Sequence, residues 1–189
     1  MSVKDFNEKK TITQTYYKNG EKFSEEIFEL SPNLSVENWV YKRPSDKTDI
    51  TAVKNAGSIH MTGTFKGNNE DKEINIGEGL WYQMMEMCIP AFLKSTLSEC
   101  LFYSIGTGDN RGAMALGEFA VKKVGEDTLQ IDGKAYSCDK VSFVFTMFSW
   151  AWTGFYWYDK ETGQMVQSGE KKGAKETILW QIKDVEYRS

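Results

Sequence analysis

The chain has 189 residues, of which 40% are hydrophobic and 14% aromatic, and its formal net charge is −4. This length suffices for one well-buried core, so we expect a single domain over residues 1–189. A nucleic-acid partner would need a concentrated basic face, which the sequence does not contain, so we expect no such partner. The high aromatic share favours β structure.

The cysteines and the first residues give little information about the cellular compartment of the protein. Cys88, Cys100 and Cys138 have no zinc or redox spacing, so we expect no metal and no cofactor there. We expect free thiols, with a Cys100–Cys138 bridge left open for an oxidising compartment. The first ten residues lack the apolar core of a secretory signal. Two locations therefore stay open: the cytoplasm, or the periplasm and cell envelope if a signal was removed.

The N-terminal half predicts consecutive short strands. Residues 11–17 and 22–30 alternate between apolar and polar residues around Asn19-Gly20, which is a strong hairpin signal. Further strands are expected at residues 36–42, 48–54, 58–66 and 73–76. Turn residues separate them at regular spacing, which indicates an antiparallel meander and not βαβ units.

Residues 80–99 form the predicted helical segment. The apolar positions recur at helical spacing: Trp81, Met84, Met85, Cys88 and Phe92. Pro90 should end or kink this helix. Because Leu80, Tyr82 and Met87 make it apolar nearly all round, we expect it to be buried in the core or to cover something apolar that is not protein.

The C-terminal half returns to the β pattern. Strands are expected at residues 101–105, 114–124, 128–131, 134–147, 152–158, 164–170 and 177–186. Asp132-Gly133 and residues 159–163 are good hairpin turns. The sequence thus indicates about ten strands and one helical segment.

The segment 141–158 dominates this half, since it is uncharged and holds three of the six tryptophans. Its length approaches the roughly twenty residues that cross a bilayer. Small and polar residues interrupt it, however, and β-branched and aromatic residues dominate, so we expect no transmembrane segment but two strands with a bend at residues 149–151.

Alternation divides the aromatic side chains of this segment between two faces. We expect Phe143, Phe145, Met147, Phe155 and Trp157 on one face. The other face would carry Val144, Phe148, Trp150, Trp152, Tyr156 and Tyr158. A strand that is apolar on both faces is covered twice, or places one face on the core and the other on a ligand or partner.

Motifs for catalysis are weak. Gly106, Gly108 and Gly112 are spaced differently from a dinucleotide-binding loop, so we expect a flexible connection between strands. His60 is the only histidine, and it has no visible catalytic or metal-ligating partners. Because no titratable constellation stands out, we expect a protein that is not an enzyme, with enzymatic activity as a third option.

Two runs carry a family resemblance. Residues 126–141, EDTLQIDGKAYSCDKV, and residues 155–163, FYWYDKETG, resemble an uncharacterised bacterial envelope family that is similar to the lipoprotein-carrier half-barrel. The resemblance implies a mainly β fold with minor α. It would be a curved antiparallel meander sheet or half-barrel, with the Pro-interrupted helix as a lid over an apolar concavity.

We therefore expect a non-enzymatic binding or carrier protein for a lipid or another hydrophobic small molecule. The residues expected to line its concavity are Trp81, Met84, Met85, Cys88, Phe92, Phe143, Phe145, Trp150, Trp152 and Trp157. The alternative is a structural or protein-interaction module that uses the exposed aromatic strand, for which a homodimer is one outcome.

Overall fold

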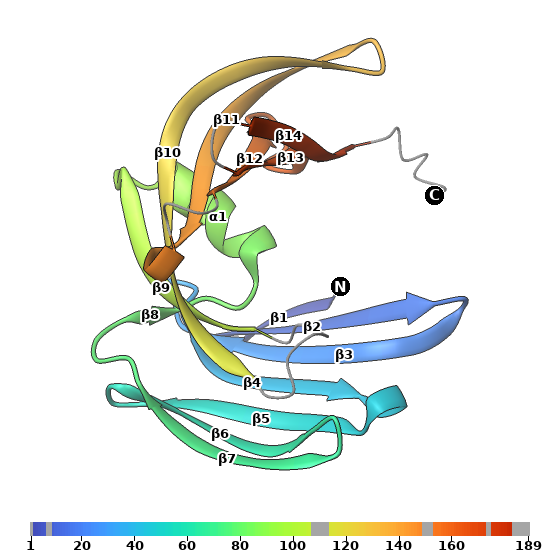
Figure 1. The fold of residues 1–189 in the computed structure, drawn as a ribbon, viewed down its shortest axis with the longest axis vertical. Coiled ribbons are helices and arrows are strands. Elements are labelled where there is room, and N and C mark those ends of the chain that lie inside the picture. Colours follow the sequence, from blue (N-terminus) through green and yellow to red (C-terminus); the bar gives the residue numbers. More distant parts are fainter. Residues whose placement is uncertain (1, 7–8, 107–113, 149–152, 173–174, 183–189) are drawn as a thin grey trace. The chain divides into compact units, whose positions relative to one another are not determined.

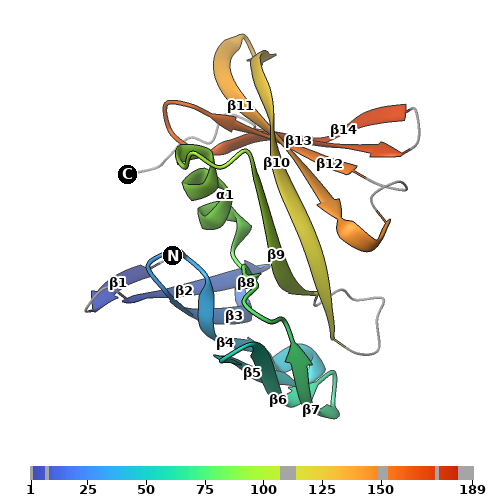
Figure 2. The ribbon, with the colours of Figure 1, turned by 90° about the vertical axis from the view of Figure 1, so that its left-hand side faces the viewer.

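The computed structural model describes residues 2–6, 9–106, 114–148, 153–172 and 175–182. Over these residues the chain forms two seven-stranded sheets and one α-helix (Figures 1 and 2). Each strand pair whose register is described is antiparallel. The predicted class, mainly β with minor α, is confirmed, although the strands divide between two sheets.

The contacts divide the chain into two compact units. Unit 1 comprises Met1–Gln83 and Tyr103–Gly117, and unit 2 comprises Met84–Phe102 and Glu118–Ser189. Each unit therefore takes part of strand β9 (Glu99–Gly106) and part of strand β10 (Ala115–Ile131). The single domain expected from the sequence stays a prediction.

The first sheet is a meander in chain order. Its strands are β1 (Ser2–Phe6), β2 (Lys9–Lys18), β3 (Glu21–Leu30), β4 (Val36–Arg43), β5 (Thr48–Asn55), β6 (Ser58–Phe65) and β7 (Asn68–Asn75), with a 3-10 turn, η1 (Pro44–Asp46), before β5. The β2–β3 hairpin turns at Asn19 and Gly20, whose φ angles of 55° and 82° suit the predicted turn.

One face of this sheet carries the core of unit 1. Phe28, Trp39, Ala52 and Met61 are successive cross-strand partners, and each is at most 1% exposed. The indole N–H of Trp39 donates to Glu26 Oε2 at 2.9 Å, so the buried polar atom of this ring is satisfied. The row of large side chains across the strands holds the sheet in register.

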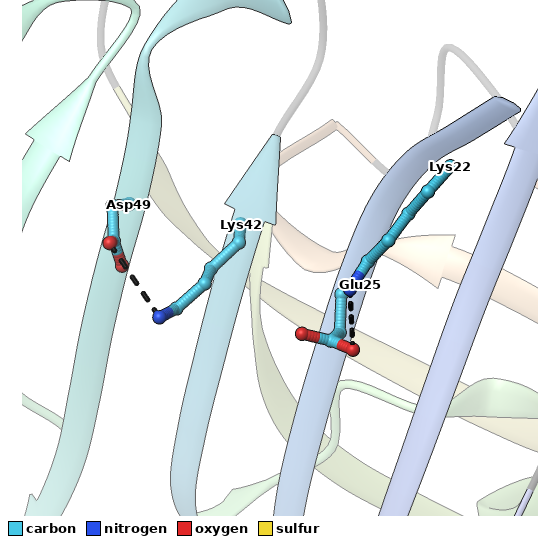
Figure 3. A network of polar contacts seen from close by, with 4 residues as sticks. All are labelled: Lys22, Glu25, Lys42 and Asp49. Atoms are coloured by element: carbon cyan, nitrogen blue, oxygen red, sulfur yellow. Dashed lines mark hydrogen bonds and ion pairs between the residues drawn. The ribbon is translucent and has the colours of Figure 1, made fainter. Parts of the chain in front are cut away.

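The opposite face of the same sheet is polar. Lys22 Nζ lies 2.8 Å from Glu25 Oε2, and Lys42 Nζ lies 3.8 Å from Asp49 Oδ2 (Figure 3). Glu25, Lys42 and Asp49 are neighbours across β3, β4 and β5, so charges of opposite sign alternate. Such exposed pairs contribute at most about 1 kcal/mol each, and their mixed signs do not form a basic surface.

The second sheet runs in the order β14-β13-β12-β11-β10-β9-β8. Its remaining strands are β8 (Leu80–Trp81), β11 (Lys134–Phe145), β12 (Thr153–Asp159), β13 (Met165–Lys172) and β14 (Lys175–Gln181), with a 3-10 turn, η2 (Thr146–Phe148), after β11. Figure 1 shows β10 and β11 as a long bent hairpin. A register shift between Lys123 and Gly125 accompanies the bend, because a bulge increases local twist.

The helix α1 spans Met85–Lys94 and is shorter than the sequence predicts. Its predicted first residues, Leu80 and Trp81, instead form β8, and the Tyr82 N–H donates to Tyr103 O at 2.9 Å. Pro90 lies inside the helix and does not end it. Within the described parts of the chain, no helix has the length and apolar character needed to cross a membrane.

Candidate functional site: an apolar cavity in unit 2

The register of β11 and β12 decides which side chains share a face. Val141 is opposite Tyr156, and Phe143 is opposite Gly154. We call the face that carries Val141, Phe143 and Tyr156 the helix face, and the opposite face, which carries Trp157, the indole face. The structure thus differs from the predicted alternation, which grouped Trp157 with Phe143. Alternation within one strand shows which of its residues share a face. It does not show which face of the next strand lies on the same side of the sheet, because the connection between the strands sets this register.

Helix α1 covers the helix face. Lys123, the cross-strand partner of Val141, places Nζ 5.3 Å from the centre of the Phe92 ring and donates to Ser95 O at 2.6 Å. Cys88 and Phe92 are 3% and 6% exposed. The apolar side of the helix therefore packs on the sheet of unit 2, as an amphipathic helix does.

A cavity of about 560 Å³ lies in unit 2 along the start of α1 and the strands β11, β12 and β13. Its volume falls within the range typical of small-molecule sites. The lining residues are Met85, Ile89, Phe143, Tyr156, Tyr158, Gly163, Gln164 and Met165. Helix and sheet thus both contribute side chains to the lining of one apolar space.

The chemistry of this lining is apolar with a few polar atoms. Phe143 and Tyr156 meet edge to face, with centroids 6.0 Å apart and an interplanar angle of 83°. Met85 and Met165 are flexible thioethers that adapt to irregular shapes. Burial raises the pKa of Tyr156, so its hydroxyl stays protonated in neutral solution. The cavity therefore offers apolar surface together with neutral hydrogen-bonding groups.

An aromatic cluster supports the Phe143 wall. The Phe119 ring lies 4.9 Å from Phe143 and 5.3 Å from Phe145, and the Phe102 ring lies 5.7 Å from Phe143, measured between centroids. These tilted ring contacts add to the stabilisation that burial of the side chains provides. Phe143 is thus held by aromatic rings on β9, β10 and β11.

The β12–β13 turn supplies the polar rim. Asp159 Oδ2 accepts hydrogen bonds from the Thr162 N–H at 3.1 Å and the Thr162 hydroxyl at 2.7 Å. The Gly163 N–H donates to Asp159 O at 2.8 Å, and the Gly163 φ of 70° needs glycine. This predicted turn is confirmed, and it presents Gly163 and Gln164 to the cavity.

Lys160 of the same turn belongs to a cluster of charges with residues of β10 and β11. Lys160 Nζ lies 2.6 Å from Glu126 Oε1 and 3.8 Å from Asp139 Oδ1, and the two carboxylates belong to cross-strand partners. The hydrogen bond from Lys160 to Glu126 raises the pKa of the lysine. The Lys160 ammonium is therefore already paired with protein carboxylates.

The structure brings together only part of the predicted site. Met85 and Phe143 line the cavity. Three other predicted residues are buried in or beside α1 but do not line it: Met84, Cys88 and Phe92. Phe145 lies in the aromatic cluster. Trp81 is fully buried in β8 of unit 1, and Trp157 lies on the indole face. Trp150 and Trp152 lie outside the described residues, as does most of the glycine-rich connection. The sequence analysis did not identify six of the lining residues: Ile89, Tyr156, Tyr158, Gly163, Gln164 and Met165. Ile89 follows Met85 by four positions, which is a helical spacing that could have identified it. The residues of β12, β13 and their turn depend on strand pairing, for which the sequence gives no signal.

Trp157 instead anchors the core on the indole face. Its indole N–H donates to Asp127 Oδ2 at 2.7 Å, and Lys140 Nζ lies 4.6 Å from the ring centre. Cys138 packs in the same cluster, where burial, followed by the charges of Asp159 and Asp127, raises the pKa of its thiol to about 11. Protein side chains therefore cover the indole face, where Trp157 and Cys138 belong to a hydrophobic cluster of unit 2.

Other chemistry-bearing residues do not assemble a site in the part of the chain that the structure describes. His60 Nε2 lies 2.9 Å from Asp71 Oδ1 on an exposed strand face. In that part of the chain, no group of histidine, cysteine and acidic residues is placed to hold a metal ion. Cys88, Cys100 and Cys138 are buried thiols, and none of the three forms a disulfide, so the Cys100–Cys138 bridge is absent. The cavity is therefore the best candidate for a functional site.

Comparisons with known proteins found no match to the chain among protein-family models, curated proteins or solved structures.

Proposed function

We propose that this chain is a non-enzymatic binding or carrier protein for a lipid or another apolar small molecule, held in the cavity of unit 2. The observation that carries the proposal is a space of about 560 Å³ lined by Met85, Ile89, Phe143 and their apolar neighbours. Concave, mostly apolar sites with a few polar groups are typical of small-molecule binding. The resemblance of residues 126–141 and 155–163 to an envelope family supports a role in a bacterial cell envelope as part of this proposal.

The transfer of apolar surface from water would drive binding. A sixteen-carbon chain gains about 13 kcal/mol at about 0.8 kcal/mol per buried CH₂ group. Association costs on the order of 5 kcal/mol at the lower end of its range. The remaining gain of about 8 kcal/mol corresponds to a Kd near 1 μM. A carrier of this kind holds its ligand firmly and still releases it.

The test is a competition experiment with a fluorescent apolar probe, accompanied by native mass spectrometry of the purified protein. Ile89→Trp should fill the cavity and weaken probe binding at least about tenfold, because the larger side chain occupies ligand volume. Leu101→Trp is the matched control, since Leu101 is 54% exposed and does not line the cavity. Circular dichroism verifies that both variants fold. A wild-type protein that carries no lipid and binds no apolar probe would overturn the proposal.

A second candidate function, a protein-interaction module, is favoured by the edge strand β14. Ile178, Leu179 and Trp180 are 45%, 58% and 44% exposed, and β14 ends the strand order of its sheet in the described chain. An exposed apolar edge can pair with another strand, and we propose a second copy of this chain as its occupant. Light scattering coupled to size exclusion tests this, and a strict monomer at high protein concentration would contradict it.

A further inference from the structure

The polar groups of the cavity are neutral. Among its lining residues, Tyr156 and Tyr158 carry phenol hydroxyls and Gln164 carries an amide. No hydrogen bond to the Tyr156 hydroxyl occurs among the described residues, although the ring forms part of the cavity wall. Tyr156 is partly buried, and a phenol hydroxyl on the wall of an apolar cavity is a polar group that can serve a ligand.

The lysines on the helix face are engaged elsewhere. Lys160 Nζ contacts Glu126 Oε1 at 2.6 Å, and Lys123 Nζ donates to Ser95 O at 2.6 Å while lying over the Phe92 ring. Neither lysine is among the residues that line the cavity, so neither ammonium is placed there as the counter-charge of an anionic ligand. An ionised group enters an apolar site only at high cost unless it is paired.

From these contacts we infer that the ligand is uncharged and carries a hydroxyl or carbonyl group that hydrogen-bonds to Tyr156. The inference rests on the proposed function and narrows its ligand class to neutral lipids such as long-chain alcohols and esters. Ionised fatty acids and cationic amphiphiles are excluded from that class, because the described lining offers neither of them a counter-charge.

Three probes of equal chain length test the class: 1-dodecanol, dodecanoate and dodecylammonium. Each competes with the same fluorescent apolar probe at about pH 8, where the carboxylate and the amine are both ionised. Dodecanol should displace the probe at a concentration at least tenfold lower than either charged compound. If dodecanoate or dodecylammonium competes as well as dodecanol, the ligand class is overturned and the proposed function stands. If none competes, the proposed function itself is overturned.

Tyr156→Phe tests the assigned hydroxyl. The variant should weaken dodecanol binding about fivefold, because phenylalanine lacks the hydroxyl that pairs with the alcohol group. Tyr136→Phe is the matched control, because Tyr136 is a partly buried phenol that packs with the cluster on the indole face. Equal dodecanol affinity in wild type and Tyr156→Phe, with both proteins folded by circular dichroism, would overturn the role of Tyr156.

Discussion

The buried thiol of Cys138 predicts a loss of stability in alkaline solution. The side chain is fully buried, and burial together with the neighbouring acidic groups raises its pKa from the ordinary 9.0 to about 11. The folded protein therefore keeps the thiol proton at a pH where the unfolded chain has lost it. The resulting stabilisation is complete below about pH 9 and is lost as the pH rises towards 11.

The magnitude follows from the two pKa values. One proton held by the folded but not the unfolded state lowers the free energy of unfolding by about 1.4 kcal/mol per pH unit. Between about pH 8 and about pH 10.5 the loss from Cys138 alone should reach about 2 kcal/mol. Burial also raises the pKa of Tyr156, which adds a loss of the same sign.

Urea denaturation of wild type and Cys138→Ala at these two pH values isolates the thiol. The alanine variant should be about 1 kcal/mol less stable at pH 8, because it loses buried side-chain atoms of the Trp157 cluster. All other titrating groups act in both proteins. The advantage of the wild type should therefore disappear or reverse at high pH. A difference between the two proteins that stays constant across the range would refute the reasoning.

Four further variants test the backbone conformation and the packing. Gly63→Ala should lower the free energy of unfolding by more than about 2 kcal/mol, because the Gly63 φ is 124° and the new Cβ would clash with the main-chain oxygen of Asp49. Gly133→Ala should cost only about 1 kcal/mol, because its φ is 80° but the new Cβ would meet open space. Thermal melts measure both losses, and equal losses would contradict the steric role assigned to Gly63. Trp157→Phe removes the donor to Asp127 and should cost about 1–2 kcal/mol in urea, whereas an unchanged midpoint would argue against that hydrogen bond. Pro90→Ala restores a helix N–H and should raise the melting temperature, and a lower value would show that the ring's packing outweighs the donor.

Turns could be predicted from the sequence because their chemistry is local. Asn19-Gly20 and Asp132-Gly133 both adopt positive φ at each position, which few residue pairs tolerate. The β12–β13 turn likewise closes on Gly163. With the turns known, the strands between them and the antiparallel class followed.

The cavity could be predicted only in outline, because it depends on non-local pairing. The helical spacing of Met85 and the aromatic content of β11 identified one residue from each wall, Met85 and Phe143. The register between β11 and β12 places Tyr156, and not Trp157, on the face that carries Phe143 and the cavity. The pairing of Trp81 in β8 also overrode its helical periodicity.

The division of unit 2 into Met84–Phe102 and Glu118–Ser189 has a consequence for synthesis on the ribosome. Ile89 and Met165 line the same cavity, so 76 further residues must be made (165 minus 89) before the helix meets its last partner. At about 5–20 residues per second, this takes roughly 4–15 seconds. Over that interval the apolar side chains of Met85–Lys94 lack their partners on β13, so tertiary packing cannot yet stabilise this short helix.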